Sequence, residues 1–177
     1  FVGLKAGAAS GALAPVLCGS AAKNIGFPQL LDALVDLLPA PAELPAVSLG
    51  GEEGELAPDS GGPFCGFVFK TIVDQHAGQL SVIRVVAGKL SGDTQVVNTA
   101  SGAKERVGQL LKLEGRKTVQ VEDASVGEVV AVAKLKGTHA GDTLCDPKRA
   151  VKLPRLHEFP PVISFALEAK KRGEEDK

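Results

Sequence analysis

The sequence predicts a mainly β protein: a small antiparallel β-barrel of six or seven strands, with a strand-loop-helix segment before it and one strand after it. Apolar and polar residues alternate on either side of a turn at Ala77-Gly78, which is the period of strands with one buried face. Further short β-rich stretches, separated by Gly or polar turns, follow as far as Asp146. This spacing is typical of a barrel or sandwich, and we favour a barrel because closure removes exposed strand edges.

The chain begins with a segment of α/β type, which we assign to residues 1–39. The apolar run from Ala14 to Cys18 is typical of a buried strand. From Phe27 to Leu38, apolar residues recur at the spacing of one helix face, with Pro28 in the first turn. A strand, a loop and a helix in this order are pieces of an α/β domain.

The predicted barrel occupies residues 64–147. In its opening hairpin we expect one alternating face at Phe67, Phe69, Thr71 and Val73, and another at Ile83, Val85 and Ala87. Later strands are expected over residues 94–98, 104–113, 118–121, 128–135 and 143–146.

The segments around the barrel have a different character. Residues 40–63 are rich in Pro, Gly and acidic residues without an apolar period, so they are expected to be a linker. Residues 148–161 form a basic connector interrupted by prolines, and Val162 to Ala169 alternates again at the start of a unit over 162–177. Because a lone strand cannot fold by itself, this last strand is either an added barrel edge or the first strand of a further domain.

The charge is unevenly distributed along a chain whose net charge is -1. Residues 1–63 carry two basic and seven acidic side chains, whereas residues 84–155 carry thirteen basic and eight acidic ones. A basic module is what contact with a phosphate backbone uses, and a solvated barrel surface is the alternative interpretation.

Composition also indicates the cellular compartment. No run approaches 18 apolar residues and the N-terminus lacks a signal-peptide layout, so no membrane span or membrane partner is expected. Cys18, Cys65 and Cys145 are odd in number and widely spaced, which favours three buried thiols in a reducing, cytoplasmic setting over a disulfide or metal framework. The absence of Met, with Phe1 opening the chain, predicts that it is part of a longer protein.

Four strings in the chain resemble one known family. They are Pro15-Val16-Leu17-Cys18-Gly19-Ser20-Ala21 with Lys23-Asn24, Gly26 and the later Leu38-Pro39; Phe69-Lys70-Thr71 with Asp74, His76, Gly78 and Arg84-Val85-Val86; Ala133-Lys134-Leu135 with residues 141–145; and residues 159–163 with 168–170. In this order they resemble elongation factor G, a translational GTPase. They match the end of its GTPase domain with the fifth guanine-recognition motif, its second domain, and the entry to its third domain.

The resemblance covers essentially the whole chain and implies its organisation. Residues 1–39 would be the C-terminal remnant of the GTPase domain, 64–147 a translation-protein barrel, and 162–177 the start of a ferredoxin-like third domain. The exact member stays open, because Val86-Ala87 replaces an aromatic residue and Ser that the main factor tends to have. An elongation factor G-like paralogue and a ribosomal protection or release-factor relative are both compatible.

The resemblance also implies a guanine-binding loop at Ser20, Ala21 and Ala22 in the intact parent protein. GTP and Mg²⁺ are the implied cofactors of that parent. The chain has no G-x-x-x-x-G-K-[ST] phosphate loop and no Asn-Lys-x-Asp, so we expect it to bind no cofactor and to be inactive by itself. Asp59-Ser60-Gly61-Gly62 spells a switch motif, but it lies out of order and we interpret it as a coincidence.

For the barrel, the resemblance implies docking on the RNA of the small ribosomal subunit and packing against the parent's own GTPase and third domains. DNA is not an expected partner. Candidate phosphate contacts are Arg84, Lys89, Lys104, Arg106, Arg116 and Lys117. Seven Phe without Tyr or Trp argue against base stacking, so these contacts would position rather than read sequence. Lys70 and Arg84 lie within the opening hairpin, either pointing outward or buried and paired.

Other functions remain open from the residues alone. A stand-alone RNA- or protein-binding β-barrel without GTPase activity is the main alternative. His76, His139 and His157 lie in different turns without metal-ligand spacing, so we interpret them as turn residues. A hydrolase with a Cys-His pair is a third possibility that no motif indicates.

Overall fold

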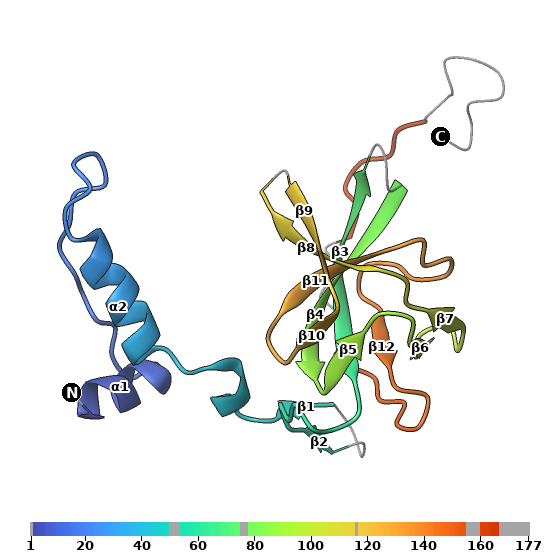
Figure 1. Ribbon diagram of the computed structural model, residues 1–177, viewed down its shortest axis with the longest axis horizontal. Coiled ribbons are helices and arrows are strands. Elements are labelled where there is room, and N and C mark those ends of the chain that lie inside the picture. Colours follow the sequence, from blue (N-terminus) through green and yellow to red (C-terminus); the bar gives the residue numbers. More distant parts are fainter. Residues whose placement is uncertain (1, 50–53, 75–77, 116, 155–159, 167–177) are drawn as a thin grey trace.

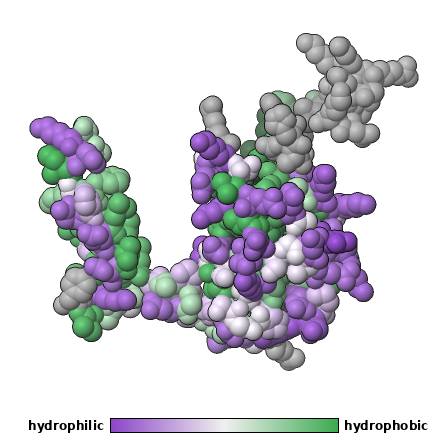
Figure 2. All heavy atoms as spheres, in the orientation of Figure 1, coloured by the Kyte–Doolittle hydropathy of each residue, from purple (hydrophilic) through white to green (hydrophobic). Residues whose placement is uncertain are grey.

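The computed structural model describes residues 2–49, 54–74, 78–115, 117–154 and 160–166. It has a helical part at the N-terminal side and a β-rich barrel, joined by the segment that follows the second helix (Figure 1). In that view the two helices stand apart from the strands. Figure 2 shows apolar atoms exposed along the helical part, whereas polar atoms cover much of the visible face of the barrel.

The helical part contains one expected and one unexpected helix. Helix α2, Phe27–Leu37, confirms the predicted helix, with a proline in its first turn. Helix α1, Val2–Ala9, was not predicted because it has no clear apolar face. The predicted strand at Ala14 to Cys18 does not form, and Val16 is 90% exposed. A strand needs a neighbour for its backbone groups, and the described residues offer none beside this segment.

The barrel is one antiparallel sheet of eight strands and a separate two-stranded ladder. The sheet order is β7-β6-β12-β3-β4-β11-β8-β9. Its strands are β3 Cys65–Asp74, β4 Gly78–Ala87, β6 Gln95–Asn98, β7 Lys104–Arg106, β8 Leu110–Glu114, β9 Lys117–Val121, β11 Val129–Ala133 and β12 Thr143–Cys145. The ladder pairs β5, Lys89–Ser91, with β10, Asp123–Ser125. The mainly β fold is therefore as predicted.

Two details of the strands differ from the prediction. The expected strand over residues 104–113 is split into β7, at one end of the sheet order, and β8, the last strand but one at the other end, with residues 107–109 outside both. Val107 is fully buried there, and its N–H donates to the carbonyl of Thr94 at 2.9 Å. The ladder β5–β10 was not predicted, since strands of three residues carry too little period to be recognised.

The core lies inside the curled sheet, which is not closed by hydrogen bonds between its end strands. In the described part of the chain, β7 and β9 each pair with one neighbour only. The β5–β10 ladder contributes Leu90 and Ala124 to the main core, beside Val68, Ile83 and Leu110 and others. The ladder therefore buries core residues without completing the ring.

The opening hairpin has an irregular register. The strand β4 buries Ile83, Val85 and Ala87 as predicted. The prediction for β3 is wrong: Val68 is the fully buried residue, whereas Phe69 is 39% and Val73 81% exposed. A register shift between Val68 and Lys70 leaves Phe69 as an extra residue, so the apparent alternation runs across two faces of the sheet.

The linker contains elements that its composition did not indicate. A short 3-10 helix, η1, spans Pro41–Glu43, and strands β1, Val47–Ser48, and β2, Glu55–Leu56, pair with each other. Leu49 and Leu56 are buried in a cluster with Cys65, Ala87, Cys145 and Leu153 of the barrel and its connector. The linker thus packs on the barrel rather than only spanning a gap.

The segment after the barrel also differs from the prediction. Leu153 of the connector is buried, but residues 160–166 form no strand. Val162, Ile163 and Phe165 are exposed, because no described strand lies alongside to pair with them. The rest of the predicted strand, from residue 167 onward, lies outside the described residues.

Candidate guanine loop and basic surface

The predicted guanine loop is a tight turn between two backbone hydrogen bonds. The N–H of Ser20 donates to the carbonyl of Ile25 at 2.9 Å, and the N–H of Ile25 donates to the carbonyl of Ser20 at 3.0 Å. Asn24 has a positive φ of 52°, which lets the chain reverse over so few residues. Gly26, with φ 79°, then starts helix α2.

This turn leaves Ala21 and Ala22 exposed at its tip. The described hydrogen bonds include no protein acceptor for their N–H groups. A shallow hollow of about 200 Å³ lies beside the turn and includes Cys18, Ser20 and Phe27 in its lining. Backbone donors beside an apolar hollow are compatible with the edge and face of a purine base.

Two of the six candidate RNA-contact residues are held by carboxylates. Lys89 Nζ lies 2.8 Å from Asp123 Oδ2, across the β5–β10 ladder. Arg106 Nη2 lies 3.2 Å from Asp93 Oδ1, with both side chains largely exposed. These partners reduce the positive charge that either cation presents to a phosphate.

The other candidates are spread over the barrel instead of forming one patch. Lys104 is exposed on β7 and Lys117 is exposed on β9, at the two ends of the sheet order. Figure 1 places β7 and β9 on different sides of the barrel. Arg116 lies outside the described residues. The structure therefore separates a β7 group, Lys104 and Arg106, from a β9 group that contains Lys117.

Arg84 and Lys70 both point outward from the opening hairpin, which resolves the choice left open by the sequence. Arg84 lines a hollow of about 340 Å³ between the linker and the barrel, together with Pro41, Val47 and Val126 and others. This hollow is mostly apolar. Arg84 is consequently near the linker and lies on β4 rather than on β7 or β9.

A buried polar network next to β7 was missed by sequence reasoning. Glu105 is 7% exposed, and its carboxylate accepts hydrogen bonds from Gly137 N at 2.7 Å and from Thr138 Oγ1 at 3.2 Å. Asn98 Nδ2 donates to Asp142 Oδ2 at 2.9 Å and to the carbonyl of Gly137 at 3.0 Å. Together these bonds fix the turn that follows β11 against β6 and β7.

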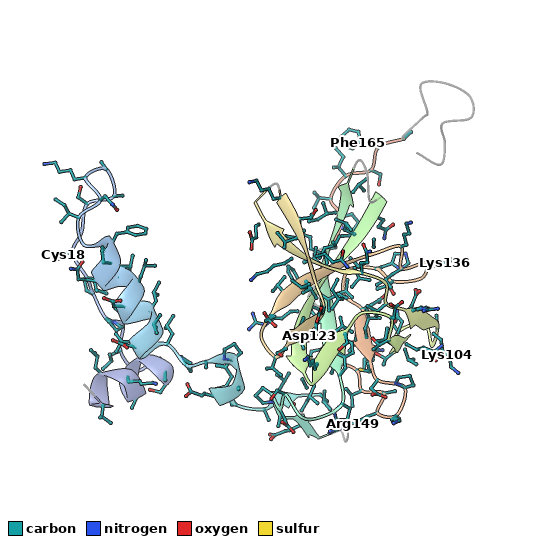
Figure 3. All side chains as sticks on the ribbon, in the orientation of Figure 1. Cys18, Lys104, Asp123, Lys136, Arg149 and Phe165 are labelled. Carbon is teal, nitrogen blue, oxygen red and sulfur yellow. The ribbon has the colours of Figure 1, made fainter. Side chains whose placement is uncertain are left out.

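The fixed turn presents another lysine on the side of β7. Lys136 is exposed, and its N–H donates to Glu105 Oε2 at 3.3 Å. Figure 3 shows Lys104 and Lys136 on the same side of the barrel. Lys136 reaches this side through hydrogen bonds of residues 98 and 105 to the turn at 137, so no local pattern around Lys136 indicated it.

Asp59 does structural work in the linker, which is consistent with the interpretation that its switch-like motif is a coincidence. Its Oδ1 accepts the N–H of Gly61 at 2.9 Å. Its carbonyl accepts the N–H of Gly88 at 2.7 Å. The first bond lies within the linker, and the second attaches the end of the linker to the turn between β4 and β5.

The cysteines are arranged differently from the expectation of three buried thiols. Cys18 is exposed on the helical part, whereas Cys65 and Cys145 are buried side by side in the barrel. His139 is exposed, with Nδ1 4.0 Å from Asp142 Oδ2, and the other two histidines lie outside the described residues. No cluster of three or more metal-ligating side chains occurs among the residues that the structure describes. No helix in the described ranges is long and apolar enough to cross a membrane.

A comparison with protein families adds to this geometry. Residues 63–147 match the model of elongation factor G domain 2, and they include every strand of the curled sheet and the ladder. The barrel is therefore the second-domain barrel of a translation elongation factor. Over these residues the chain is similar to elongation factor G.

Proposed function

We propose that this chain works as part of a GTP-dependent elongation factor whose barrel docks on small-subunit ribosomal RNA and relays the nucleotide state of the GTPase domain. The match of residues 63–147 to elongation factor G domain 2 is the observation that carries the proposal. The step served would be translocation or a related one, in the cytoplasm. No feature of the described barrel residues favours a stand-alone binding module over this role.

Within the barrel, we assign the RNA contact first to the side of β7. Lys104 and Lys136 are exposed there, and the network around Glu105 fixes the turn that carries Lys136. Arg106 is also on β7, but it forms an ion pair with Asp93. A lysine on a fixed turn loses less conformational freedom on binding than one on a mobile segment, which supports its use in positioning contacts.

The relay would pass through the linker, since this segment connects the helical part to the barrel. Leu49 and Leu56 are buried against barrel residues, and the carbonyl of Asp59 accepts the N–H of Gly88. The helical part would supply Ser20, Ala21 and Ala22 to the guanine base. When GTP is bound to the parent protein, Mg²⁺ would neutralise phosphate charge through residues that this chain does not include.

Ribosome co-sedimentation tests the docking surface. Charge reversal at both Lys104 and Lys136 should weaken binding of the chain to ribosomes by roughly tenfold or more at low salt, because each lost phosphate contact removes counterion release. The loss should shrink at higher salt. Lys117→Glu on the far strand β9 and Lys23→Glu on the helical part are the controls, and combining them in one chain matches the charge change of the double variant.

The results separate the two groups of lysines. Weaker binding of the Lys104 and Lys136 variant alone would support the β7 side. Weaker binding of the Lys117 variant alone would move the contact to β9. Binding that is indifferent to all four changes and to salt would contradict RNA docking by this barrel.

Calorimetry tests the nucleotide part of the proposal. The chain has no phosphate loop, so GTP is expected to show no micromolar affinity for it. A micromolar dissociation constant for GTP would contradict the assignment of the phosphate site to a separate part of the parent protein.

A further inference from the structure

Cys65 and Cys145 occupy directly opposite positions on paired strands. Cys65 is on β3 and Cys145 on β12, in antiparallel register with each other. Their Sγ atoms lie 3.6 Å apart. The two residues are 80 positions apart in the chain, so the fold alone brings them together.

The backbone geometry at this pair suits a disulfide. The N–H of Asp146 donates to the carbonyl of Phe64 at 2.9 Å, so the ladder bond flanks the cysteines and they form a non-hydrogen-bonded pair. Cα atoms at such positions are about 4.5 Å apart. Disulfides span Cα distances of about 4.4 to 6.8 Å, so side-chain rotation is enough to bring the sulfurs to bonding distance.

The two thiols also differ in acidity in a way that suits a stepwise reaction. The hydrogen bond to Cys145 and burial raise the pKa of the Cys65 thiol well above its usual range. The same hydrogen bond lowers the pKa of the Cys145 thiol. The pair therefore loses its first proton more readily from Cys145 than from Cys65.

We propose that Cys65 and Cys145 form a reversible intramolecular disulfide when the chain meets a hydroperoxide. The Cys145 thiolate attacks a peroxide oxygen: an S–O bond forms, the O–O bond breaks, and a sulfenic acid and one water or alcohol result. Cys65 then attacks the sulfenic sulfur, so that the S–S bond forms, the S–O bond breaks and water leaves. Two thiols lose two electrons and two protons, and the peroxide accepts them.

Access to the pair is controlled by the linker and the connector. Leu49 and Leu56 from the ends of the β1–β2 hairpin, and Leu153 from the connector, are in the same cluster as both cysteines. Strands of two residues form a marginal hairpin that opens locally at low cost. The rate of oxidation should therefore report how often the linker lifts from the barrel.

This inference does not depend on the proposed function, because it needs only the barrel, its linker and a peroxide. The test uses the whole chain with Cys18→Ser, which leaves only the two buried cysteines. The chain is treated with hydrogen peroxide, then unfolded and alkylated, and its intact mass is measured. We expect the loss of two hydrogen atoms, simultaneous protection of both thiols, and full reversal by dithiothreitol.

Two control variants and an unfolded control make the outcome decisive. Cys65→Ser and Cys145→Ser, each in the same background, should not lose two hydrogens and should gain oxygen on the remaining sulfur or stay reduced. Oxygen adducts on the two-cysteine chain without loss of hydrogen would overturn the proposal. So would a chain that stays reduced when folded but forms the disulfide in urea.

A further variant tests the access route. Leu56→Ala should speed disulfide formation by roughly tenfold or more, because it weakens the packing of the hairpin over the cysteines. Leu30→Ala on α2 removes an equal side chain far from the pair and should leave the rate unchanged. Equal rates for Leu56→Ala and the parent chain would overturn the role of the hairpin.

Discussion

Large apolar side chains are partly exposed in the helical part and buried in the barrel. Along α2, Phe27, Leu30, Leu31 and Leu34 lie on one face and stay between 38% and 51% exposed. In the barrel, Val68, Ile83 and Leu110 are completely buried. The helix satisfies its own backbone hydrogen bonds, so it forms with its apolar face uncovered, whereas a strand needs a neighbour and brings burial with it.

This difference shows which part of the molecule stabilises itself. The barrel residues bury one another, so substitutions there act on the free energy of unfolding of the chain as it stands. Among the described residues of the helical part, Leu37 in α2 is the single buried one, and substitutions at the exposed positions of that helix should change little. The following variants test this contrast in pairs, one change in the barrel and one outside it.

The largest effect is expected for Ile83→Ala. Ile83 is fully buried in the main core, and removing its side chain should cost about 2 to 5 kcal/mol of unfolding free energy. Leu31→Ala on α2, where the side chain is half exposed, should change stability by no more than about 0.5 kcal/mol. Because the chain has no Trp or Tyr, denaturation followed by far-ultraviolet circular dichroism is the measurement. Equal costs would contradict the contrast.

Gly88→Ala is expected to have the second-largest effect on stability. Gly88 has φ 69°, and an added Cβ would lie 2.6 Å from the backbone nitrogen of Phe64. The strain and the clash should cost roughly 2 to 4 kcal/mol. Gly11 has a similar φ of 72° with open space around it, so Gly11→Ala isolates the backbone term at about 1 kcal/mol. If the two alanine variants unfold at the same denaturant concentration, the prediction that the close approach at Gly88 adds to the cost is wrong.

Glu105→Ala should have an intermediate effect. It removes the acceptor for Gly137 N and Thr138 Oγ1 in a buried network, which should cost roughly 1 to 3 kcal/mol. Glu43→Ala in the linker also removes an acceptor, for the N–H of Ala40, but that bond is exposed. Its loss should be below about 1 kcal/mol. Hydrogen exchange of Gly137 measures the local effect, and unchanged protection in the Glu105 variant would contradict the network.

The smallest effect is expected for Lys89→Ala. Its ion pair with Asp123 is half exposed, so its loss should cost at most about 1 kcal/mol and less at high salt. Lys23→Ala, on the exposed turn of the helical part, should be neutral. Denaturation at two salt concentrations compares them, and a salt-independent loss for Lys89→Ala would assign the effect to packing of its aliphatic stem instead.

Local patterns predicted the elements whose cause is local. Helix α2 ends within one residue of its prediction because its apolar period and its prolines lie within a single stretch of chain. The inner face of β4 was predicted for the same reason. The phase of β3 was not, because the extra residue Phe69 is defined only by the pairing of β3 with β4.

The candidate sites depended even more on contacts distant in sequence. The composition of the barrel indicated a basic surface, but only the fold pairs Lys89 with Asp123 and Arg106 with Asp93. The contact between Cys65 and Cys145 joins residues that spacing alone had suggested were separate thiols. Residue type therefore predicted the chemistry available, and tertiary pairing decided which groups are free to use it.

The irregular register of the opening hairpin has a consequence for its length. Phe69 is the spare residue of β3, and the shift between Cys65 and Gly66 leaves Val86 as a spare residue of β4. One insertion on each strand offsets the other, so both strands contain ten residues and their ends stay level. Deleting either spare residue alone would misalign one end of the hairpin, whereas deleting both together would shorten it evenly.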